Sequence, residues 1–63
     1  MSYIVTGTNS AGVLSLKRDT AEAAVKKAVE LMGEGTRDVH ITDPDGRVYR
    51  DGEFAQLYTA ART

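Results

Sequence analysis

Two short turns that contain glycine each separate a pair of segments with the residue patterns of β-strands. The first turn, NSAG at residues 9–12, lies between residues 3–8, which are rich in β-branched and aromatic types, and residues 13–17, in which apolar and polar residues alternate. Alternation of this kind is typical of a β-strand with one buried face, and a short turn with glycine joins antiparallel strands. The first turn therefore predicts a β-hairpin in which Val5 faces Leu16.

The second turn lies in an acid-rich stretch, DPDGRVYRDGEF at residues 43–54, which suggests either a hairpin or an ion-binding loop. Pro44 suits the second position of a type I turn, and Asp43 can accept a hydrogen bond from the turn backbone. Gly46 supplies the positive φ that a three-residue hairpin loop needs. A calcium loop built around Gly46 would have an isoleucine and a glycine at its first and last ligand positions, where oxygen ligands are required. We therefore predict a hairpin and no metal site.

The hairpin registers divide the predicted sheet into two faces. In the second hairpin Ile41 faces Tyr49, and paired residues share a face. The predicted buried face consists of Val5, Leu14, Leu16, Val39, Ile41 and Tyr49. The opposite face consists of Ile4, Thr6, Thr8, Val13, Ser15, Lys17, His40, Thr42, Val48 and Arg50. The turns do not determine the order of the four strands.

Residues 19–35 carry the spacing of an amphipathic helix. Asp19 is the predicted N-cap, with Glu22 completing a capping box, and Gly33 or Gly35 ends the helix in the left-handed conformation. The predicted buried stripe consists of Ala21, Ala24, Val25, Ala28, Val29 and Met32. These side chains are mostly small, so the helix can approach a sheet closely.

A short C-terminal helix is predicted over residues 51–61, with Asp51 as its N-cap. Its apolar stripe consists of Phe54, Leu57, Tyr58 and Ala61. This helix either docks beside the first one or reaches across to a second copy of the chain. The predicted fold class is α+β, in the order β-β-α-β-β-α: a four-stranded antiparallel sheet from two hairpins, one long helix packed on one face and a short C-terminal helix.

The chain is long enough for one domain, residues 1–63, and contains no cysteine. A domain of this size buries only about 60% of the surface that its unfolded chain exposes. Disulfides and thiolate metal sites are excluded, so idealised local structure or self-association is the expected source of extra stability. No apolar stretch approaches the roughly 18 residues that cross a bilayer, and the first residues do not resemble a signal peptide. We expect a cytoplasmic protein without a membrane or metal partner.

Catalytic motifs are absent from the sequence. His40 is the only histidine, and a general base also needs a nucleophile or an orienting carboxylate. Residues 7–12 have the glycine spacing of a phosphate loop, but a predicted strand follows them where such a loop opens a helix. We therefore expect no enzymatic activity and no cofactor.

The leading hypothesis is a non-enzymatic protein-interaction module, a homodimer or a binder of another protein, that uses the sheet face or the C-terminal helix. Its candidate interface residues are Phe54, Leu57, Tyr58, Ile4, Val13 and Val48. The alternative is a small nucleic-acid-binding regulator with a local basic face of Lys17, His40, Arg47 and Arg50. The net charge of −1 disfavours this alternative, because nucleic-acid affinity comes largely from neutralising phosphates. A third interpretation is an ordinary solvated sheet face.

Overall fold

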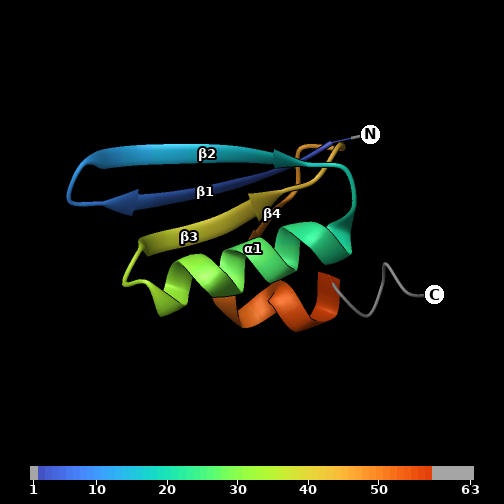
Figure 1. The fold of residues 1–63 in the computed structure, drawn as a ribbon. Coiled ribbons are helices and arrows are strands. Elements are labelled where there is room, and N and C mark those ends of the chain that lie inside the picture. Colours follow the sequence, from blue (N-terminus) through green and yellow to red (C-terminus); the bar gives the residue numbers. More distant parts are fainter. Residues whose placement is uncertain (1, 58–63) are drawn as a thin grey trace.

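The computed structural model describes residues 2–57, apart from the side chain of Asp51, and has the predicted α+β architecture (Figure 1). Tyr58 and Ala61 of the predicted C-terminal stripe lie outside this range. The elements are β1 (Tyr3–Asn9), β2 (Gly12–Arg18), α1 (Ala21–Gly33), β3 (Arg37–Thr42), β4 (Val48–Arg50) and the 3-10 turn η1 (Asp51–Glu53). Residues 54–57 continue from η1 as the short C-terminal helix.

The four strands form one antiparallel sheet in the order β2-β1-β3-β4. Both hairpin registers are as predicted: Val5 pairs with Leu16, and Ile41 pairs with Tyr49. The strand order, which the sequence left open, results from pairing of β1 with β3. The inner strands are therefore the first strand of each hairpin, and β2 and β4 form the two edges.

Asp43 organises the second turn as predicted. Its Oδ1 accepts hydrogen bonds from the backbone N–H groups of Asp45 at 3.0 Å and Arg47 at 2.8 Å. The N–H of Gly46, whose φ is 89°, donates to the carbonyl oxygen of Asp43 at 3.0 Å. The Asp43 carboxylate and Gly46 thus both stabilise the backbone of the hairpin turn.

A β-bulge that the sequence did not predict lies where β1 meets β3. The register shifts between the pairs Thr6–His40 and Thr8–Arg37, and Asp38 takes a positive φ of 54°. Gly7, opposite the bulge, is buried. Gly7 lies here beside Thr36, in the connection between α1 and β3.

The N-cap of α1 is Thr20, so the prediction of Asp19 is wrong. Thr20 has an extended backbone, and its Oγ1 accepts a hydrogen bond from the N–H of Ala23 at 3.1 Å. Its carbonyl oxygen also accepts the first helical bond, from the N–H of Ala24 at 3.0 Å. The helix begins one residue later than predicted. The third position after the cap is then Ala23, so Glu22 cannot complete a capping box.

The C-terminus of α1 is a Schellman motif centred on Gly35, one of the two predicted glycines. Gly35 has a φ of 88°, and its N–H donates to the carbonyl oxygen of Met32 at 3.1 Å. The N–H of Thr36 donates to the carbonyl oxygen of Leu31 at 3.0 Å. These two bonds satisfy carbonyl groups that the helix end would otherwise leave without partners.

The buried face of α1 is rotated relative to the predicted stripe. Leu31 is buried at 5% exposure, whereas Val29 is 53% exposed and Met32 is also exposed. Leu31 continues the spacing of the three buried alanines of α1, at positions 21, 24 and 28, and Val29 lies farther round the helix. The prediction failed for Val29 and Met32 because both stripes have helical spacing, and only packing against the sheet selects one of them.

The core lies between the sheet and the two helices, which run side by side on one face (Figure 1). Val5 and Ile41 are fully buried at its centre. Phe54 and Leu57 of the C-terminal helix belong to the same cluster. Of the two arrangements left open by the sequence, the structure therefore has the one in which this helix docks beside α1 in its own chain.

Candidate interaction surface

The sheet face opposite the helices carries two rows of side chains that the pairing of the strands aligns. One row runs across the sheet as Lys17, Ile4, Thr42 and Val48. The next row runs as Ser15, Thr6, His40 and Arg50. The first row is partly apolar and the second is polar. Hydroxyl groups of Thr6 and Ser15 lie 3.4 Å apart within the second row.

The apolar candidates on this face do not form one patch. Val13 is 73% exposed on β2 and Val48 is 45% exposed on β4, so the two lie at opposite edges of the sheet. Ile4 is half-buried between Lys17 and Thr42. The other predicted interface residues are elsewhere, since Phe54 and Leu57 are buried in the core and Tyr58 is outside the described range.

The predicted basic face is divided between the two sides of the sheet. Lys17, His40 and Arg50 share the open face, and His40 pairs directly with Arg50. Arg47 is separate from them, because its guanidinium carbon lies 5.6 Å from the centre of the Tyr49 ring. Tyr49 pairs with Ile41 on the helix side, so Arg47 forms a cation–π contact there.

His40 has one ring nitrogen fixed by the bulge. Its Nδ1 lies 2.8 Å from the carbonyl oxygen of Asp38. A carbonyl oxygen can only accept, so Nδ1 donates and Nε2 is the acceptor nitrogen of the neutral ring. Within residues 2–57 no group of three His, Cys, Asp or Glu side chains could hold a metal ion. This histidine thus acts as a structural partner of the strand backbone.

The two edge strands of the sheet differ in length and in how they are protected. β4 has three residues and runs directly into η1, where the N–H of Arg50 donates to Oε1 of Glu53 at 3.1 Å. β2 has seven residues, paired without interruption to β1, and no described strand pairs with its outer side. This edge could not be predicted from the sequence, because the two turns do not determine the order of the strands.

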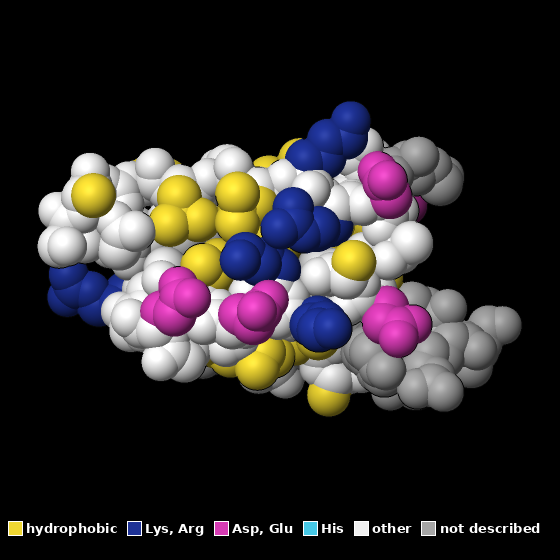
Figure 2. Space-filling model, viewed as in Figure 1, with side chains coloured by type: hydrophobic (Ala, Val, Ile, Leu, Met, Phe, Trp, Pro, Cys, Tyr) yellow, Lys and Arg dark blue, Asp and Glu magenta, His cyan; other side chains and the backbone are white. Residues whose placement is uncertain are grey.

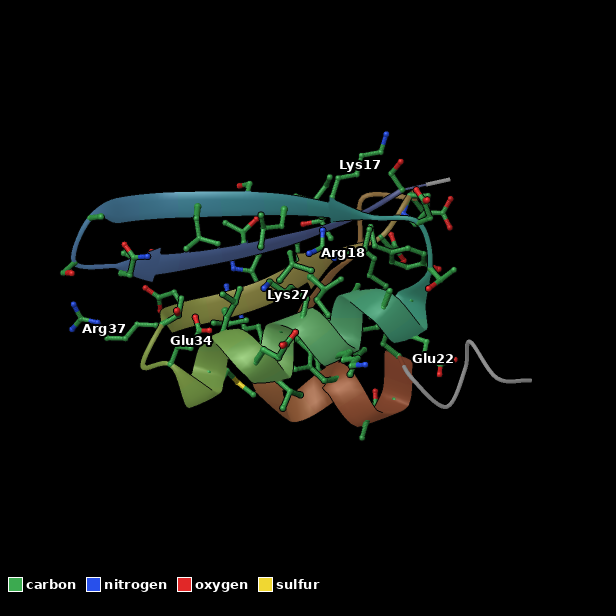
Figure 3. The ribbon with its side chains drawn as sticks, viewed as in Figure 1. Lys17, Arg18, Glu22, Lys27, Glu34 and Arg37 are labelled. Carbon is green, nitrogen blue, oxygen red and sulfur yellow. The ribbon has the colours of Figure 1, made fainter. Side chains whose placement is uncertain are left out.

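Half-buried leucines and charged side chains accompany the β2 edge. Leu14 and Leu16 point to the helix side and pack against the core only in part. Figure 2 shows hydrophobic side chains gathered between β2 and α1, next to Lys and Arg side chains. In the same view Lys27 of α1 and Arg18, the last residue of β2, lie between the strand and the helix (Figure 3). Nη1 of Arg18 also donates to the carbonyl oxygen of Lys17 at 2.7 Å.

Comparisons with protein-family models, with curated proteins and with solved structures found no match to this chain. Among the described residues, no helix has the length and apolar character needed to span a membrane.

Proposed function

We propose that this protein is a non-enzymatic protein-interaction module that associates with a second copy of itself through its sheet. The observation that carries the proposal is the incomplete cover of the sheet, on one of its faces and along its β2 edge. Both helices pack on one face (Figure 1), and the opposite face carries Val13 at 73% exposure. Within the described range, the long β2 strand also has an unpaired outer side. A strand with unpaired backbone groups is a ready template for another strand.

The sheet supports the proposal better than the C-terminal helix does. Phe54 and Leu57 contribute to the core of their own chain, and burial of each stabilises the fold by about 1.5–3 kcal/mol. Turning these side chains toward a second copy would sacrifice that stabilisation in a domain with a small core. The sheet can be used without changing the fold.

The non-enzymatic part of the proposal is supported by the position of the single histidine. His40 uses Nδ1 for a backbone carbonyl and pairs with Arg50 across the strands. A general base for acyl or proton transfer needs a nucleophile or substrate within hydrogen-bonding reach and an orienting acid on the other nitrogen. In this protein Nδ1 of His40 binds a backbone carbonyl group of its own strand instead.

The test is the mass of the protein in solution, measured by light scattering coupled to gel filtration over a wide range of concentrations. We expect the mass to rise toward that of a dimer with increasing concentration. A mass that stays at the monomer value throughout would contradict self-association. Binding of a monomer to oligonucleotides, weakening steeply with salt, would support the nucleic-acid alternative through Lys17, His40 and Arg50.

A further inference from the structure

We infer that two copies pair through β2, antiparallel to each other, in the register that sets Ser15 opposite Ser15 of the second copy. This inference rests on the proposed self-association and specifies its geometry. The two sheets of four strands would then join into one continuous sheet, with all helices on the same face. The joint would lie on a twofold axis beside Ser15, as an isologous interface requires.

The choice of β2 follows from the contrast between the two edges. Edge strands are usually protected by shortness, bulges, proline or cover from another element. β4 is short and runs into a helical turn. β2 has seven residues, no proline and an uninterrupted register with β1. Lys17 and Arg18 are its only charged residues, and both stand at one end.

The register follows from which side chains would face each other. Directly opposed residues share a face of the sheet. With Ser15 at the axis, Leu14 faces Leu16 of the second copy. Each half-buried leucine then shields the exposed part of the other from water. Centring on Leu16 would place Leu14 opposite Arg18, and centring on Lys17 would place two lysines face to face. Only the Ser15 register sets both leucines opposite a leucine, and it also keeps the cations of the two copies apart.

Charges along the same side of the molecule fit this rotation. In Figure 3, Glu34 and Arg37 lie near the end where β2 begins, and Arg18 and Glu22 lie near the end where it finishes. A twofold rotation beside Ser15 brings each end toward the opposite end of the second copy. Glu34 then lies toward Arg18 of the second copy, which places opposite charges near both symmetry-related ends of the joint. Arg37 takes no part, because it lies on β3 and β1 separates β3 from the β2 edge.

Pairing through the open face fits the structure less well. The central row of that face is polar, and Val13 and Val48 stand at opposite edges. Stacked sheets bury apolar side chains from both inner faces. The β2 edge instead provides backbone donors and acceptors together with the paired leucines.

The absence of cysteine in the chain gives a direct test by cross-linking. We expect Ser15→Cys to form a disulfide-linked dimer under mild oxidation, because directly opposed Cβ atoms lie about 4.5–5.5 Å apart. Matched controls are Val13→Cys and Lys17→Cys on the same strand. In the inferred register each of these faces the other position, so two copies of one variant hold their thiols roughly 13 Å apart. Efficient cross-linking of either control instead of Ser15→Cys would overturn the inferred register.

A charge exchange at the same position provides a second readout. Ser15→Glu and Ser15→Lys should each weaken self-association about fivefold at low salt, because like charges meet at the axis. An equimolar mixture of the two variants should associate more tightly than either alone. Thr6→Glu and Thr6→Lys are matched controls, since Thr6 pairs with Ser15 on the inner strand β1.

The outcomes separate this inference from the proposed function. A parent protein that stays monomeric contradicts both. A dimer that ignores the Ser15 variants and dissociates with the Thr6 variants retains self-association and overturns pairing through β2. Circular dichroism of each variant establishes that the strands are still folded.

Discussion

Gly7 of β1 lies against Thr36, which follows the end of α1: a Cβ atom added at position 7 would stand 2.6 Å from Cγ2 of Thr36. It would also stand 3.3 Å from Cγ2 of Val39 in the bulge of β3. The glycine is thus required by the close packing of β1 against β3 and the connection that leads into it.

Gly7→Ala should destabilise the fold by about 1–3 kcal/mol, the usual cost of overpacking in a core. Urea unfolding measures the free-energy change. Thr36→Ser removes the opposing methyl group, so the double variant should recover part of the loss. Gly33→Ala is the matched control, because its new Cβ has no neighbour within 4 Å and alanine favours the helix. Equal stability of Gly7→Ala and the parent would contradict the close approach.

Thr20→Ala should cost about 1 kcal/mol of stability, whereas Asp19→Ala should change it little. The reason is the hydrogen bond that Oγ1 of Thr20 accepts from the N–H of Ala23. Thermal or urea unfolding of the two variants, measured side by side, distinguishes the caps. A larger loss for Asp19→Ala would favour Asp19 as the cap.

Asp43→Ala should destabilise the second hairpin by about 1 kcal/mol, because two backbone N–H groups lose their acceptor. Asp45→Ala is its matched control in the same turn, since Asp45 contributes its backbone N–H to this arrangement and would keep it. Asp43→Asn retains an acceptor oxygen and should fall between the two. Equal effects of both alanine variants on the unfolding midpoint would argue against a specific role for the Asp43 carboxylate.

Leu31→Ala should destabilise the protein by about 2–5 kcal/mol, because it leaves a cavity in the core. Val29→Ala, on the exposed side of the same helix, should change stability by no more than about 0.5 kcal/mol. Hydrogen exchange of the α1 amides measures the stability of the helix in both variants. It remains usable if Leu31→Ala unfolds too readily to give a full denaturation curve. The opposite ranking would mean that α1 presents the Val29 side to the sheet.

Local features of the chain were predictable from sequence because short-range interactions determine them. Gly46 and Asp43 define a turn by backbone geometry and one carboxylate, so the register of the second hairpin followed. The cap of α1 was ambiguous, because Asp19 and Thr20 are adjacent and both residue types cap helices. The rotation of α1 depends on packing against the sheet, which neighbouring residues do not encode.

The candidate interaction surface was less predictable for the same reason. Residues on the open face followed from alternation, but Arg47 was assigned to that face and instead packs over Tyr49. The bulge in β3 was not predicted either. Its residue with positive φ is Asp38, whereas glycine is the residue type that would have indicated such a conformation. The exposed edge of β2 depends on which strands are central, which is a property of the assembled sheet.

Val5 from the first strand shares a buried cluster with Phe54 and Leu57 from the last described helix. During synthesis, the first hairpin and α1 leave the ribosome before the segments that complete this cluster. Contacts between distant parts of a chain form slowly, and an incomplete sheet exposes its strands meanwhile. The core can therefore close only after residue 57 has been synthesised, and until then Val5 lacks two of the side chains that cover it.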